Sequence, residues 1–167
     1  MRTSGRKPLL TRKIVTLREL KREIAKLKKQ GRKIVFTNGC FDILHYGHAK
    51  YLHDAKNKGD ILVVAVNSDS SIRKIKGKDR PVVSQNYRLK LLSALESIDY
   101  LVLFKETTPL AVITEIKPDI LVKGADWSKS KIAGSDFVAS YGGKVATIKL
   151  VEGLSTTNLI NKIAKAK

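Results

Sequence analysis

The chain has 167 residues, of which 43% are hydrophobic, and it carries a formal net charge of +18. This length and composition suit one domain with a full core and exclude intrinsic disorder. No apolar run approaches the ~20 residues of a membrane span, and the N-terminus lacks the apolar core of a signal peptide. The single cysteine, Cys40, excludes an internal disulfide and fits a reducing compartment. We therefore expect a cytoplasmic protein with no membrane partner.

The positive charge is concentrated at the N-terminus. Residues 1–33 contain 13 Lys/Arg and 2 Asp/Glu, a net of +11, whereas residues 34–167 contain 20 and 13, a net of +7. Three interpretations are open: a solubilising surface, a field that attracts anionic small substrates, and an arm that binds nucleic acid. Aromatic residues make up only 6% of the chain and no nucleic-acid-binding motif is present, so we do not expect nucleic acid as a partner.

The chain begins with a predicted tail and a predicted helix. Residues 1–15 are expected to form a flexible basic tail. The sequence "TLRE" at 16–19 is a capping box, which predicts an N-terminal helix over 16–31 that ends at Gly31. The apolar positions of that helix are Leu17, Leu20, Ile24 and Leu27. Residues 32–167 are then the main domain.

Strands and helices alternate through that domain. Strands are predicted over 33–36, 61–66, 100–104, 120–122 and 144–150. Helices are predicted over 46–57, from Ser84 with Tyr87, Leu91, Leu92 and Leu95 on one face, after Pro109, around 137–141, and from Ser155 or Thr156 with Leu159, Ile160 and Ile163 inward. The polar stretch 67–81 is predicted to be a mobile loop. This order indicates an α/β fold, a Rossmann-like open parallel sheet with helices on both faces.

Polar stretches follow four of the predicted strands, at 37–48, 67–81, 123–128 and 151–157. Ligands of open parallel sheets bind beyond the carboxyl ends of the strands, where the strand order reverses. The four stretches are therefore expected to form one site.

The first of these stretches contains two histidines, His45 and His48, on either side of Gly47. The pair has three possible interpretations: a metal site, a structural role as cap and packing residue, and a phosphate site. The metal interpretation lacks a third histidine, because His53 is displaced from His48 by roughly 140° around a helix, and no cysteine pair completes a site. Asp42 remains possible as a ligand. The phosphate interpretation uses every feature, since a helix N-terminus, glycines and imidazole donors all favour an anion. We therefore expect no metal bound directly by the protein.

The segment "NGCFDILHYGH" resembles the nucleotidyltransferases of the cytidylyltransferase-like superfamily, which carry an H-x-G-H motif. The similarity continues along residues 30–165. It is strongest to the bacterial heptose 1-phosphate adenylyltransferase family, through "GDILVVAVNSD", "KGKDRPV", "YRLKLLSALESIDYLV", "TPLAVITEIKPDILVKGAD" and "VEGLSTTNLI". The resemblance implies transfer of AMP from ATP to heptose 1-phosphate, with Mg²⁺ carried by the triphosphate, in a protein that forms a homodimer.

The resemblance also implies roles for individual residues. Those expected to act in catalysis are His45, His48 and Lys76. Those expected to bind the nucleotide are Cys40, Phe41, Gly47, Gly124, Asp126, Ser155, Thr156 and Thr157. Those expected to bind the sugar phosphate are Asp42, Asn67, Asp69, Arg80, Arg88 and Lys123. Asp42 is expected to orient the turn rather than act as a direct ligand, and Asn67 and Asp69 either bond sugar hydroxyls or help to order the loop.

Three departures from the heptose family pattern concern the base. Trp127 replaces a common Tyr and Ala125 a common Gly, which favours the CTP-dependent glycerol-phosphate cytidylyltransferases of the same superfamily. Leu154 leaves the last motif without an arginine that often precedes "STT". The alternative is thus a cytidylyltransferase acting on glycerol 3-phosphate or a similar alcohol phosphate. A second alternative is a nucleic-acid-binding module built on the basic arm.

Overall fold

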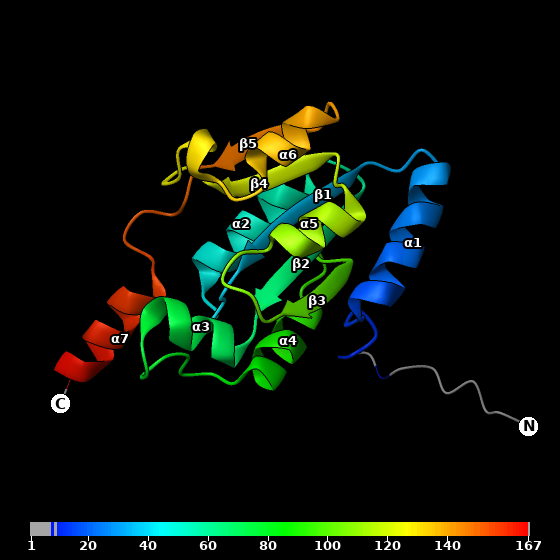
Figure 1. Ribbon diagram of the computed structural model, residues 1–167. Coiled ribbons are helices and arrows are strands. Elements are labelled where there is room, and N and C mark those ends of the chain that lie inside the picture. Colours follow the sequence, from blue (N-terminus) through cyan, green and yellow to red (C-terminus); the bar gives the residue numbers. More distant parts are fainter. Residues whose placement is uncertain (1–7, 9, 167) are drawn as a thin grey trace, which may run out of the picture.

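The computed structural model describes residue 8 and residues 10–166, and its centre is a five-stranded, all-parallel sheet (Figure 1). The strands are β1 (Ile34–Gly39), β2 (Ile61–Asn67), β3 (Tyr100–Phe104), β4 (Ile120–Gly124) and β5 (Lys144–Ile148). Their order across the sheet is β3-β2-β1-β4-β5. The predicted open parallel α/β sheet is confirmed.

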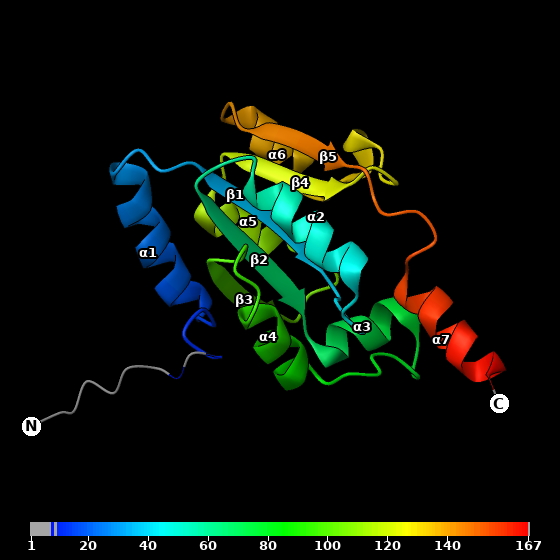
Figure 2. The ribbon, with the colours of Figure 1, turned by 180° about the vertical axis from the view of Figure 1, so that it is seen from behind.

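Seven α-helices are described, and they lie on both faces of the sheet and at its carboxyl edge. They are α1 (Leu17–Lys29), α2 (Tyr46–Lys56), α3 (Asp69–Lys76), α4 (Gln85–Ser93), α5 (Leu110–Ile116), α6 (Ser135–Ser140) and α7 (Thr156–Lys165), with a short 3₁₀ turn at Lys129–Lys131. Helices α2 and α4 cover one face (Figure 2), and α1, α5 and α6 cover the other.

Side chains alternate in direction along each strand, so the core is divided between the two faces of the sheet. In β1, Val35 belongs to the core cluster that includes α2 and α4, whereas Ile34 and Phe36 belong to the cluster that includes α1 and α5. Successive side chains of a strand point to opposite faces, so a strand buried on both sides must be apolar throughout. The run "ILVVAV" of β2 meets that requirement.

The N-terminal helix begins as the sequence predicts. The Thr16 side chain accepts a hydrogen bond from the Glu19 amide, and the Glu19 carboxylate accepts one from the Thr16 amide. The preceding residues, assigned to the flexible tail, contact the sheet: the Val15 amide donates to the Leu101 carbonyl at 2.9 Å. This pairing covers part of the exposed edge of β3. The tail residues 1–7 and 9 lie outside the described part of the chain.

Three local predictions were wrong. Residues 69–76 of the predicted loop form α3, which Ser68 caps and which buries Ile72 completely. Of the residues predicted to share one face of the helix from Ser84, Leu92 is buried and Leu95 packs against the core, as expected. Tyr87 and Leu91 are instead 65% and 50% exposed, because α4 turns Arg88 and Leu89 toward the sheet beside Leu92. Helix α7 buries no residue, and Ile163, predicted to lie inward, is 64% exposed. This last helix lies beyond the strand ends, next to α3, rather than on a face of the sheet.

Within the described residues, no helix is both long and apolar enough to cross a membrane.

Candidate nucleotide site

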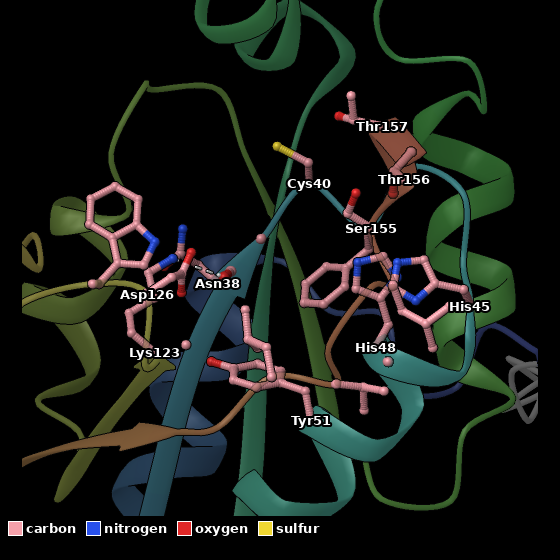
Figure 3. A pocket seen from close by; sticks show the side chains of 18 of the residues that line it. Asn38, Cys40, His45, His48, Tyr51, Lys123, Asp126, Ser155, Thr156 and Thr157 are labelled. Atoms are coloured by element: carbon pink, nitrogen blue, oxygen red, sulfur yellow. Dashed lines mark hydrogen bonds between the residues drawn. The ribbon is translucent and has the colours of Figure 1, made fainter. Parts of the chain in front are cut away.

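A cavity of about 320 Å³ opens at the carboxyl ends of β1 and β4, where the strand order reverses (Figure 3). All four of the polar stretches predicted to meet there contribute to it. The predicted site residues that line it are Cys40, Phe41, His45, Gly47, His48, Lys76, Lys123, Gly124, Asp126, Ser155, Thr156 and Thr157. The remaining five, Asp42, Asn67, Asp69, Arg80 and Arg88, are not among its lining residues.

The turn after β1 is shaped by Gly39 and Phe41. Phe41 adopts a positive φ of 46° and is 5% exposed, and its ring stands edge-on to the imidazole of His48 with centroids 5.3 Å apart. A Cβ atom on Gly39 would lie 2.9 Å from the Phe41 ring. Only glycine therefore lets the turn fold so that Phe41 supports His48.

His45 and His48 form a stacked pair at the N-terminus of α2. Their ring centroids are 3.9 Å apart. His45 occupies the N-cap position without a side-chain cap hydrogen bond. Both ring nitrogens of His45, and Nδ1 of His48, are buried without a hydrogen-bond partner. Because buried polar atoms in native proteins are generally paired, these nitrogens indicate a ligand that supplies the partners.

The electrostatics of this pair favour the neutral state in the free protein. Burial, reinforced by His45 and Lys76, lowers the pKa of His48 to about 4. Burial also lowers the pKa of His45. Lys76 is the last residue of α3 and lines the cavity, so a cation stands near the imidazoles without an anion between them. An anionic ligand would reverse this unfavourable balance.

The start of α7 lies against the same cavity as the imidazoles (Figure 3). Ser155 Oγ accepts a hydrogen bond from the Asn158 amide at 3.0 Å, so this hydroxyl acts as the helix cap. Thr156 Oγ1 donates to the Ile43 carbonyl at 3.4 Å, which connects α7 to the segment before His45. Two helix N-termini, those of α2 and α7, thus meet at one cavity, an arrangement that suits a polyanion.

The β4 side of the cavity has a different character. Lys123 Nζ donates to the backbone carbonyl of Asn38 at 3.2 Å and lies 5.7 Å from the ring centroid of Trp127. Burial lowers the pKa of Lys123, and the nearby Cys40 and Asp126 act in the opposite direction. A Cβ atom on Gly124 would lie only 2.4 Å from Asp126 Oδ1, so the Asp126 side chain can fold back over the strand end only because residue 124 has no side chain.

Several lining residues were not among the predicted site residues: Asn38, Gly39, Tyr51, Trp127, Leu150, Val151 and Leu154. The Tyr51 hydroxyl lies 2.7 Å from Thr37 Oγ1, and burial raises its pKa. Asn38 could have been found from its place at the end of a strand, within the same polar stretch as the histidines. Tyr51 could not, because the sequence does not show which helical residue reaches the sheet.

Asp42 supports the rim of the site. Its side chain is buried, and it accepts hydrogen bonds from Arg80 Nε at 2.7 Å and from the amides of Val82 and Val83 at 3.0 and 2.8 Å. Burial alone would raise the pKa of Asp42, but the two amides and the guanidinium hold it below its usual value. The contacts are those of a residue that fixes segment 80–83. A role in binding sugar phosphate stays a prediction.

Arg88 connects three segments at the carboxyl edge. It is 1% exposed and donates to the carbonyls of Cys40, Asn67 and Val83 and to the Asp69 carboxylate at 2.8 Å. Because the guanidinium donates to both the Cys40 and the Asn67 carbonyls, it holds the ends of β1 and β2 together. The network gives the side chains of Arg88 and Asp69 a structural task, whereas Asn67 contributes its carbonyl and its side-chain amide donates to Ser71 Oγ. Contacts of these residues with substrate stay a prediction.

No group of three or more His, Cys, Asp or Glu side chains that could hold a metal ion occurs in the described part of the chain. Asp126 is the one carboxylate among the residues that line the cavity.

Comparison with known proteins gives consistent results. A family model described as "Cytidylyltransferase-like" matches residues 36–162. "Bifunctional protein HldE" of Campylobacter fetus is 53% identical over 152 residues, covering 91% of this chain and 31% of that protein; its counterpart in Syntrophotalea carbinolica is 51% identical, covering 89% and 31%. The chain thus spans about a third of the length of these relatives. A solved structure of a "lipopolysaccharide core biosynthesis protein" from Thermoplasma volcanium superposes with a TM-score of 0.59 at 35% identity, covering 72% of this chain and 98% of that one.

Proposed function

Because the chain belongs to the cytidylyltransferase-like family, we propose that it transfers AMP from ATP to heptose 1-phosphate, giving ADP-heptose and pyrophosphate. Its product would serve as a precursor for lipopolysaccharide-type glycans. The similarity to the lipopolysaccharide core biosynthesis protein supports this assignment, as do the sequence motifs shared with the heptose 1-phosphate adenylyltransferases.

One observation carries the proposal: the His45–His48 pair and the start of α7 line a single cavity. The two imidazoles and the hydroxyls of Thr156 and Thr157 surround the space where a polyphosphate would lie. Lys76 adds a full positive charge at the same place. A triphosphate would supply hydrogen-bond partners for the imidazole nitrogens that have none in the free protein.

The chemistry requires positioning and charge neutralisation more than proton transfer. The second pKa of a phosphate monoester is about 6, so the attacking oxygen is already ionised near neutral pH and no general base is needed. The two anions must be brought together in line, and the imidazoles and Lys76 would stabilise the charge that develops at the α-phosphate. The cavity offers a single carboxylate, so Mg²⁺ would be held mainly by the triphosphate oxygens.

The proposal is tested by measuring pyrophosphate release from purified protein with each pairing of ATP or CTP with heptose 1-phosphate or glycerol 3-phosphate. We expect turnover with ATP and heptose 1-phosphate, and its loss in excess chelator. Release only from CTP and glycerol 3-phosphate would instead identify a glycerol-phosphate cytidylyltransferase. Full activity in excess chelator would contradict the magnesium requirement.

We also infer a homodimer, and α7 is the element that supports it. This helix has apolar residues on one side, yet it buries none of them and leaves Ile163 64% exposed. Sedimentation should give twice the monomer mass, and Ile163→Glu should shift the protein toward the monomer. A monomeric wild-type protein at assay concentrations would contradict this inference.

A further inference from the structure

Where β1 and β4 end, the cavity contains a buried hydrogen-bond acceptor without a partner next to a half-buried lysine. Asn38 Oδ1 is buried and makes no hydrogen bond. Lys123 Nζ uses one of its three N–H groups on the backbone carbonyl of the same Asn38, so its ammonium and this amide are neighbours. Asn38 and Lys123 lie together with Asp126 on the side of the cavity away from His45 and Ser155 (Figure 3).

A flat apolar surface accompanies these polar groups. Trp127 lines the cavity, is 47% exposed, and has the Lys123 ammonium 5.7 Å from its ring centroid. Aromatic rings of nucleic-acid-binding proteins stack on bases, whatever the base, since every base has a π-face. The three side chains therefore offer a stacking surface, one donor and one acceptor.

This combination fits one kind of base edge. Adenine and cytosine each present an exocyclic amino group beside a ring nitrogen that accepts a hydrogen bond. Guanine and uracil present the reverse, a carbonyl oxygen beside a ring N–H. An ammonium has no acceptor, so it meets the ring nitrogen of adenine or cytosine favourably and the ring N–H of guanine or uracil unfavourably.

We propose that Lys123 and Asn38 select the base of the nucleotide, Lys123 by donating to the ring nitrogen and Asn38 by accepting from the amino group, while Trp127 stacks on the base. Lys123 is the determining residue. The Asn38 amide can rotate to offer either a donor or an acceptor, whereas the ammonium can only donate. This inference rests on the proposed function for the location of the phosphates, and it assigns Lys123 to the base rather than to the sugar phosphate.

The test uses binding, so that it does not depend on turnover. Trp127 is the only tryptophan of the chain, and its fluorescence reports stacking directly. The full chain is titrated with ATP, CTP, GTP, UTP and inorganic tripolyphosphate. We expect ATP and CTP to quench the fluorescence, GTP and UTP to require concentrations about 10-fold or more higher, as for a lost hydrogen bond to a charged group, and tripolyphosphate to compete without quenching. The ratio of the ATP and CTP constants separates the two accepted bases.

Variants assign the selectivity to Lys123. Lys123→Met should reduce the preference for ATP over GTP by about 10-fold or more, whereas Lys123→Arg, which keeps the donor, should retain it. Lys90→Met, on the exposed surface of α4, is the matched control and should behave as the wild type. Circular dichroism verifies that each variant folds. The titrations of the wild-type protein test the proposal even if a variant does not fold.

The outcomes separate this inference from the proposed function. Base selection is overturned, even if ADP-heptose forms, by any of three results. These are equal binding of ATP and GTP, quenching of Trp127 by tripolyphosphate in the absence of nucleotide, and an unchanged ATP-to-GTP preference in folded Lys123→Met. Selective binding without any product from ATP and heptose 1-phosphate supports the base selection and overturns the proposed reaction. Absence of all nucleotide binding overturns both.

Discussion

The imidazole rings of His45 and His48 stack with their centroids 3.9 Å apart and their planes inclined by 23°. Burial disfavours the charged form of His48, and the neighbouring His45 and Lys76 disfavour it further. The pKa of His48 is accordingly lowered to about 4. The proposed polyphosphate would change the sign of the surrounding potential, so its binding would be coupled to the protonation of this pair.

The first prediction is that triphosphate binding takes up protons. Near pH 6 the free protein holds His48 neutral, whereas the phosphates stabilise its charged form, so its pKa rises on binding. Calorimetric titration with ATP in buffers of different ionisation enthalpy should show net uptake that increases as the pH falls from 8 to 6. The variant His48→Gln should show less uptake, and the exposed His53→Gln should match the wild type. Uptake that does not depend on His48 would remove this histidine from the phosphate site.

A second prediction concerns stability against pH. The folded-state pKa of His48, about 4, lies below its ordinary value of 6.5, so the unfolded chain binds the proton more tightly. The free energy of unfolding should therefore fall as the pH drops from 6.5 toward 4. Denaturant midpoints measured between pH 7 and pH 4.5 should fall less for His48→Gln than for the wild type. Parallel profiles for the two proteins would show that His48 does not titrate in this way.

The architecture and the meeting of the site segments were predictable from the sequence. The pattern of apolar strands followed by polar stretches predicted that 37–48 and 151–157 lie at one edge of a parallel sheet. Ligands of such sheets bind where the strand order reverses, which predicted that the two stretches share a site. The structure confirms that His48 and Thr157 line the same cavity. Periodicity and turn residues suffice for this level of detail.

The parts that were wrong depend on tertiary contacts. Helix α3 has few apolar residues, and one of them, Ile72, anchors it in the core; its Ser68 cap was the one local signal. The inward face of α4 is set by Arg88, whose guanidinium bonds to the ends of two strands. Apolar periodicity cannot predict an inward arginine, since a buried charge is favourable only where its acceptors are already in place.

The third prediction is catalytic. Replacing His48 by alanine should lower kcat by about 10²-fold or more, as expected when a preorganised donor to a developing charge is lost. His53→Ala, on the exposed face of the same helix, is the matched control and should keep wild-type turnover. Steady-state kinetics with saturating ATP provides the measurement. Near-normal turnover of a folded His48→Ala protein would exclude the proposed role.

The fourth prediction concerns the Arg88 network. Removing one partner of a buried ion pair typically costs about 3–5 kcal/mol, and Arg88 also satisfies three backbone carbonyls. Arg88→Met should therefore lower the free energy of unfolding by an amount in that range. The exposed Arg73→Met on α3 should change it little. Denaturant unfolding measures both. A loss below about 1 kcal/mol for Arg88→Met would mean that the rim holds without the network.

The fifth prediction tests the close approach of Gly124 and Asp126. Alanine at position 124 places a Cβ 2.4 Å from Asp126 Oδ1 and 3.1 Å from Leu150, so the Asp126 side chain must move. Because Asp126 lies beside Lys123 and Asn38, where we propose that the base binds, Gly124→Ala should raise the KM for ATP more than it lowers kcat. In the background Asp126→Ala the same change should raise the KM much less, because the main clash is gone, and a double-mutant cycle measures the difference. Additive effects of the two substitutions would show that Gly124 acts independently of Asp126.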